Sequence, residues 1–155
     1  MSNDTLAITP GLFMNEVSSA LNDSSFNKER ADIIKYAINN DVVCRDYLLG
    51  IANSFTVPTV ANYLIAFIDY IPLDESAPAR TILSALYYEL GDKVISKQYL
   101  DEALNIKPDY SLALLIRRVT SAEWPSENFG ALRQELHGKV IEQLLERSDL
   151  SIEAN

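Results

Sequence analysis

The stretch at residues 77–110, APARTILSALYYELGDKVISKQYLDEALNIKPDY, decides how this chain is built. Its first half places large apolar residues at helical spacing, namely Ile82, Leu83, Leu86 and Leu90. Gly91 can take the left-handed conformation that ends a helix, and Asp92 can cap the next one. A second apolar stripe covers residues 93–106, and Pro108 prevents its continuation. The stretch therefore predicts two consecutive helices joined by a tight turn.

The same pattern recurs along the rest of the chain, where apolar stripes alternate with short links rich in Pro, Asn, Asp and Ser. It predicts helices at about residues 10–21, 27–38, 41–52, 56–71, 76–90, 93–106, 110–122 and 127–147. Period-two strand patterns are not seen. Because short links make neighbouring helices antiparallel, we expect an all-α fold of about eight helices in antiparallel hairpins. We expect a single domain over residues 1–155, with frayed tails at residues 1–8 and 148–155.

Charge and composition exclude several classes of protein. The net charge of −9 and the single adjacent basic pair, Arg117-Arg118, argue against nucleic acid and anionic lipid as partners. The acidity serves solubility or, alternatively, attracts a basic partner. Apolar runs at residues 63–68 and 112–116 are too short to cross a membrane. One cysteine excludes an internal disulfide, and we expect a cytoplasmic protein.

Candidates for chemistry are few. His137 is the only histidine and Cys44 the only cysteine, and no nearby group completes a nucleophilic pair with either. We interpret His137 as a solvated or rim side chain and Cys44 as a small buried hydrophobe. The adjacent Arg45 and Asp46 suit a salt bridge better than a functional site. We therefore expect no catalytic residues, no cofactor and no enzyme activity.

Paired acids raise the question of a metal site. Asp101-Glu102, Glu123 with Glu127, and Glu142 with Glu146 are the pairs. None lies in an aspartate-rich calcium loop, and acids at this spacing usually form solvated helix faces. We expect no metal site.

Two helices carry specific packing predictions. Gly50 lies inside an apolar helix, where it costs about 1 kcal/mol relative to alanine, so we expect another helix to approach closely there. The last helix, about residues 127–147, is predicted to cap the apolar seventh helix. Alternatively, its stripe between Leu132 and Leu145 pairs with a second copy, which makes a homodimer.

Residues 77–110 resemble a single tetratricopeptide repeat. The matching residues are Leu83, Tyr87, Gly91-Asp92, Leu100, Ala103, Leu104 and Pro108. Ser84 and Ser96 replace the usual glycine and alanine but stay small, so the helices can approach. Arg80 departs from the family, which prefers an aromatic residue there. The resemblance implies a short tetratricopeptide-like α-solenoid, a class of fold that presents binding surfaces.

A second resemblance covers about residues 29–125. Its motifs are Arg45-Asp46-Tyr47-Leu48-Leu49, Gly91-Asp92, Ala103-Leu104 and the run that begins at Pro108-Asp109-Tyr110. They are similar to the carboxy-terminal helical region of an actinobacterial family described only as a domain of unknown function. The family's amino-terminal α/β half has no counterpart here. This resemblance implies a bacterial cytoplasmic protein and no particular activity.

Tyr47, Tyr88 and Glu89 are the candidate partner-binding residues. In the tetratricopeptide family, the side of the helix that carries Tyr88 and Glu89 forms the concave groove, and Tyr47 has a related place on the third helix. Tyrosine combines apolar area with a polar group, which suits protein contacts. We therefore expect a non-enzymatic protein-interaction or assembly module that binds a protein or peptide. The alternatives are a self-associating helical domain and an unrecognised enzyme or small-molecule binder.

Overall fold

The structure, a computed structural model, describes residues 8–154, with side chains for residues 8–147. Its helices are α1 (Pro10–Asn22), α2 (Lys28–Asn40), α3 (Val42–Gly50), α4 (Val57–Tyr70), the short 3-10 helix η1 (Leu73–Glu75), α5 (Ala77–Glu89), α6 (Lys93–Ile106), α7 (Ser111–Ser121) and α8 (Ser126–Ala154). Residues 8–154 contain no strand, so the predicted all-α class is confirmed. The predicted tail at residues 1–8 lies outside the described residues except for Ile8, which packs on the core.

Several helices begin where the sequence places a capping side chain. Oγ1 of Thr9 accepts a hydrogen bond from the backbone N–H of Leu12 at 3.1 Å, and a carboxylate oxygen of Asp92 accepts one from Ile95 at 3.1 Å. These bonds satisfy backbone donors that the first turn of a helix leaves free. The helix starts are therefore local properties of the chain.

Helix α5 is the centre of the molecule. Ile82, Leu83 and Leu86 belong to an apolar cluster shared with α1–α4, whereas Ala85 and Tyr88 belong to a second cluster shared with α6 and α7. A helix that is buried on several sides has to be apolar around most of its circumference. The sequence of α5 meets this requirement with leucine and isoleucine on one side and small residues on another.

The chain reverses direction at Gly91, whose φ of +85° lies in the left-handed region. Oγ of Ser84 lies 3.1 Å from Oγ of Ser96, and the Ser96 hydroxyl donates to the Ser84 carbonyl at 2.7 Å. Small side chains thus allow α5 and α6 to approach closely, as predicted. Arg80, which departs from the repeat pattern, forms an ion pair with Glu102 of α6.

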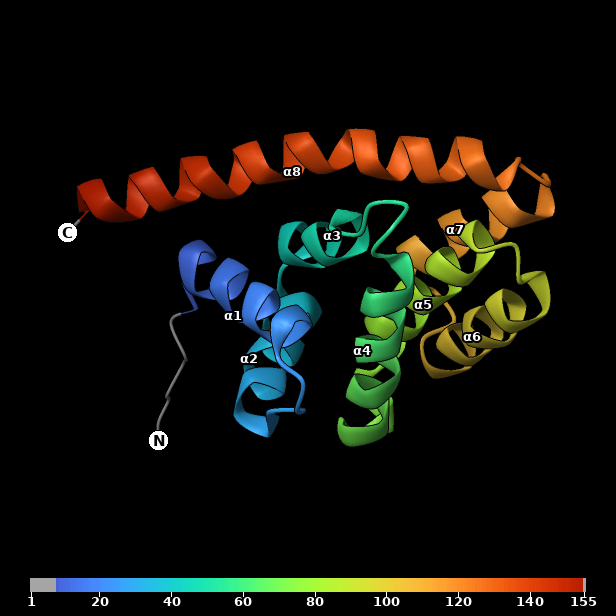
Figure 1. The fold of residues 1–155 in the computed structure, drawn as a ribbon, viewed down its shortest axis with the longest axis horizontal. Helices are drawn as coiled ribbons and strands as arrows, with labels where there is room; N and C mark the ends of the chain where they lie inside the picture. Colours follow the sequence, from blue (N-terminus) through green and yellow to red (C-terminus); the bar gives the residue numbers. More distant parts are fainter. Residues whose placement is uncertain (1–7, 155) are drawn as a thin grey trace.

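Helix α8 takes a path that the sequence did not predict. It runs across α3, α1 and α5 as one long rod along one side of the molecule (Figure 1). We expected it to cover α7, but its main support is α3, whose last residue is Gly50. It also continues to Ala154, so residues 148–154 are helical where a frayed tail was expected. No proline or glycine follows Gly138 to end the helix earlier.

Among the described residues, none of the helices combines the length and the apolar character that crossing a bilayer requires.

Candidate functional site

The three predicted partner-binding residues lie on the side of the molecule that α8 covers. Tyr47 is 9% exposed, and its ring lies between those of Phe13 and His137, with ring centroids 5.6 Å and 5.0 Å away. The side chain of Glu89 contacts α8 directly. The structure thus brings these residues to one side of the molecule, against a helix of the same chain. Whether they bind a partner stays a prediction.

Tyr88 does not line an open groove, as the tetratricopeptide resemblance implied that it would. It is only 2% exposed, and its ring packs edge-on against Phe129 of α8 at a centroid distance of 5.7 Å. Its hydroxyl donates a hydrogen bond to the carbonyl oxygen of Trp124. The side of α5 that we expected to be open is therefore filled by the start of α8.

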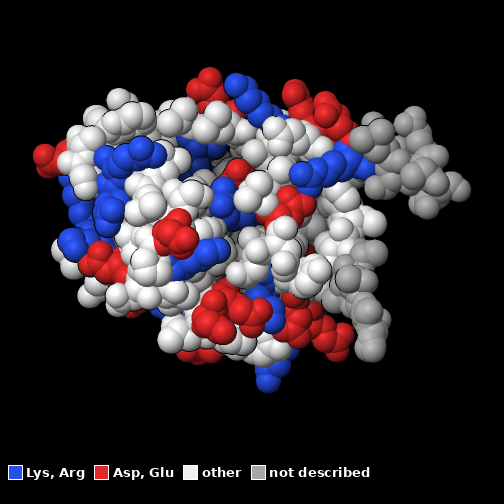
Figure 2. Space-filling view, turned by 180° about the vertical axis from the view of Figure 1, so that it is seen from behind, with Lys and Arg blue, Asp and Glu red and all other residues white. Residues whose placement is uncertain are grey.

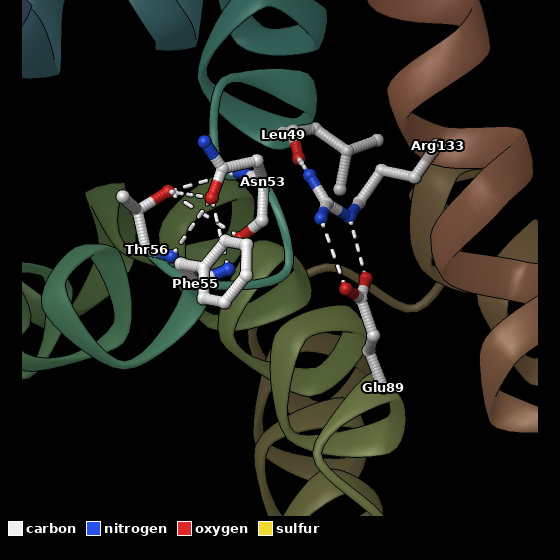
Figure 3. Close-up of polar contacts among 6 residues, drawn as sticks. All are labelled: Leu49, Asn53, Phe55, Thr56, Glu89 and Arg133. Atoms are coloured by element: carbon white, nitrogen blue, oxygen red, sulfur yellow. Dashed lines mark hydrogen bonds and ion pairs between the residues drawn. The ribbon is translucent and has the colours of Figure 1, made fainter.

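A buried ion pair joins α8 to α5 (Figure 3). Nε of Arg133 donates to Oε1 of Glu89 at 2.8 Å, and Nη2 donates to Oε2 at 3.2 Å. Nη1 donates to the carbonyl of Leu49, at the end of α3, at 3.1 Å. The side chains of Arg133 and Glu89 are 2% and 10% exposed. One guanidinium thus joins α8, α5 and α3, and its contact with Glu89 has the bidentate geometry typical of arginine–carboxylate pairs.

Two glycines allow α8 to lie this close. A Cβ added to Gly50 would be 2.8 Å from Nδ1 and 2.9 Å from Cβ of His137. A Cβ added to Gly130 would be 2.6 Å from the carboxylate carbon of Glu89. The close helix contact predicted at Gly50 is confirmed, and its neighbour is α8.

An open groove lies beside this contact, with a volume of about 500 Å³. Its floor is the end of α3, and its walls are α7 and α8. The groove is lined by Arg45, Asp46, Leu49, Gly50, Leu112, Leu115, Ile116, Arg118, Val119, Trp124, Phe129, Leu132, Arg133, Leu136 and Val140. Four of these are large apolar side chains with substantial exposure, namely Leu115 (47%), Leu136 (47%), Trp124 (41%) and Leu132 (37%). Such a concentration of exposed apolar side chains is typical of a binding surface.

The arginines that line the groove differ in whether they form an ion pair. Arg45 pairs with Asp46 at 2.9 Å, as predicted, and Arg133 pairs with Glu89. Within residues 8–147, Arg118 forms no ion pair, which distinguishes it from the other two arginines of the lining. Figure 2, which views the molecule from behind, shows a hollow with both basic and acidic side chains beside it. The groove is therefore apolar with one uncompensated positive charge.

Burial shifts the pKa values of Cys44 and His137 in opposite directions. Burial, followed by the charge of Asp41, raises the pKa of the Cys44 thiol to about 12, so the thiol stays protonated at neutral pH. Burial, followed by the charge of Arg133, lowers the pKa of His137. Nδ1 of His137 is buried and has no hydrogen-bond partner among the side chains and backbone that the structure describes. Cys44 is a buried apolar-type side chain, as expected. His137, which we interpreted as a solvated or rim side chain, is instead half-buried against Tyr47.

The paired acids are engaged elsewhere or solvated. Asp101 pairs with Lys97 at 2.8 Å, and Glu102 pairs with Arg80. In the part of the chain that the structure describes, no three His, Cys, Asp or Glu side chains converge as metal ligands would.

Comparison of the chain with family models, with curated proteins and with solved structures finds no match in any of the three. Both family resemblances drawn from the sequence therefore remain predictions. Arg118 and Leu115 were not predicted from the sequence as binding residues, and Leu136 was considered only as part of the stripe that could pair with a second copy. The available signals were the seventh helix, which is apolar nearly all round, and the leucine stripe of the eighth.

Proposed function

We propose that this chain is a non-enzymatic protein-interaction module and that its docking surface is the groove between α7 and α8. The observation that carries the proposal is the set of exposed apolar side chains that line this groove, Leu115, Trp124, Leu132 and Leu136. Leaving them in water sacrifices about 25 cal/mol for each Å² of apolar surface. A partner that covers them recovers that free energy.

The tetratricopeptide-like reading supports the proposal. Residues of α5 contact residues of α6 in the opposite order along the chain. Ser84 contacts Ser96, whereas Arg80, which precedes Ser84, pairs with Glu102, which follows Ser96. This is the order of an antiparallel hairpin, the unit from which binding solenoids are built. In this reading, α7 is the first helix of a further hairpin whose second helix is missing, so its apolar surface stays open to a partner. A cytoplasmic location accords with the single cysteine.

The test is affinity purification from the native host with identification by mass spectrometry. Leu115→Asp and Leu136→Asp place a charge in the groove at sites exposed enough to tolerate it. Val94→Asp is the matched control, since Val94 is 72% exposed on α6 and lies outside the groove. We expect the same specific partner with the wild-type chain and with Val94→Asp, and its loss with both groove variants. A partner retained by both groove variants contradicts the proposal.

Self-association is the second candidate, because α8 spans 29 residues and exposes Leu145 as well as Leu132 and Leu136. A second copy could cover these side chains. Light scattering of the purified chain over a range of concentrations separates the two functions. A monomer at all concentrations removes self-association, whereas a stable dimer that Leu145→Asp dissociates supports it.

A further inference from the structure

Two walls of the groove are helices, α7 and α8, and each carries apolar lining residues at helical spacing. On α7, the lining residues Leu112, Leu115, Ile116 and Val119 recur at three- and four-residue intervals. On α8, Leu132, Leu136 and Val140 recur at four-residue intervals. These spacings give each wall a continuous apolar stripe that faces the groove. Two such stripes suit a third helix that lies between them.

The walls also set the length of the occupant. Helix α7 has 11 residues, which at 1.5 Å per residue is about 16 Å, or three turns. The α8 wall from Leu132 to Val140 rises about 12 Å. A helix of about three turns, with apolar residues at positions i, i+3 or i+4, and i+7, would cover both stripes.

The charges that line the groove determine which charged residue the bound helix should carry. Arg45 and Arg133 are neutralised by Asp46 and Glu89, so Arg118 supplies the charge that an occupant meets. The net charge of −9 would attract basic partners at long range. Exposed charges are screened over about 8 Å at physiological salt, however, so the nearest charge dominates once a partner is docked. An acidic side chain beside Arg118 therefore completes the contact.

We infer that the groove binds an amphipathic helix of about three turns from a partner protein, with an acidic residue that pairs with Arg118. This inference rests on the proposed function and names its class of partner. It favours an acidic partner segment, in contrast to the basic partner that the overall composition suggested.

The test is a selection from a displayed peptide library. Each peptide has 14 residues, forms a helix, contains no tryptophan and is fully varied at the positions on the helix surface. The bait is the full-length chain, and binders retained by Leu136→Asp are discarded as not specific to the groove. Trp124 is the only tryptophan and lines the groove, so its fluorescence reports binding of each selected peptide in solution. A parallel selection uses Arg118→Glu, an exposed position where the reversed charge leaves the core untouched.

We expect peptides selected on the wild-type chain to have apolar residues at helical spacing and an enriched Asp or Glu, and those selected on Arg118→Glu to be enriched in Lys or Arg. A peptide with one such acid should bind Arg118→Glu about fivefold more weakly than wild type, the size of an exposed ion pair. Groove-dependent binders with no response to Arg118→Glu would overturn the acidic assignment and leave the proposed function standing. Selected peptides without helical spacing, no groove-dependent binders, or a wild-type dimer that Leu136→Asp dissociates would overturn the helical partner.

Discussion

Glu89 and Arg133 lie 44 residues apart in the sequence, and their side chains form a two-bond ion pair that joins α5 to α8. Arg133 also binds the last turn of α3 through the carbonyl of Leu49. Because the guanidinium is almost completely buried, water cannot replace a lost partner. This contact positions α8, and the position of α8 in turn defines one wall of the groove.

The ion pair predicts a strong and non-additive effect on stability. Glu89→Gln should lower the free energy of unfolding by about 3 kcal/mol, because it leaves the charge of Arg133 buried without a counter-ion. The double change Glu89→Met with Arg133→Leu should cost less than the single change, since it removes both charges. Urea denaturation gives the free energy of unfolding of the wild-type chain, of Glu89→Gln and of the double variant. Asp101→Asn, which breaks the exposed pair with Lys97, is the control and should cost under about 1 kcal/mol. A double variant that loses as much stability as Glu89→Gln, or more, contradicts this account.

Alanine substitutions at two glycines, Gly50 and Gly138, should change the stability of the fold in opposite directions. Gly50→Ala places a methyl group 2.8 Å from Nδ1 of His137, so α8 must shift, and we expect a loss of about 1–3 kcal/mol. Gly138→Ala meets nothing within 4 Å and should stabilise α8 by up to about 1 kcal/mol. Thermal unfolding of both variants tests the contact. Equal stabilisation by the two alanines would mean that α8 does not lie against Gly50.

Stability should depend on pH through His137. Its pKa is lowered in the folded state by burial and then by Arg133, so the folded chain binds fewer protons than the unfolded chain just below the ordinary value of 6.5. The contribution of His137 is therefore fully present above pH 6.5 and is lost as the pH falls below it. We expect the wild-type chain to lose more stability between pH 7.5 and pH 5.5 than His137→Gln, as measured by urea denaturation. Equal losses would show that His137 is solvated in both states.

Cys44 should resist alkylation. The thiol is buried and its pKa is raised to about 12, so little thiolate forms at pH 7.5. We expect iodoacetamide to modify Cys44 slowly in the native chain and rapidly in urea, as followed by mass spectrometry. Val94→Cys in a Cys44→Ala background gives an exposed thiol on the same scaffold as a reference for fast reaction. Equal native rates for the two thiols would contradict the burial of Cys44.

Much of the local structure was predictable from the sequence. The turn at Gly91, the caps at Thr9 and Asp92 and the close contact at Gly50 each depend on residue types with specific backbone or steric properties. The candidate site was predictable only in part. Helical phase placed Tyr88 and Glu89 next to each other on α5, but nothing local indicated that α8 would cover them.

Helix α8 shows which features the sequence predicts and which depend on the tertiary structure. Apolar periodicity predicts that α8 is a helix, because that signal depends on residues three or four positions apart. It does not say which face turns inward. Among the side chains of α8 that the structure describes, the apolar stripe is divided: Phe129 and Leu144 are buried, as is the charged Arg133, whereas Leu132 and Leu136 of the same stripe are exposed.

Helix positions, turns and the all-α class thus follow from the sequence, since the interactions responsible lie within about one turn of each residue. The path of α8, the Glu89–Arg133 pair and the open groove follow from contacts between residues many tens of positions apart. Burying a charged side chain such as Arg133 is costly unless a counter-ion lies beside it, and the packing of the other helices is what brings Glu89 to that position.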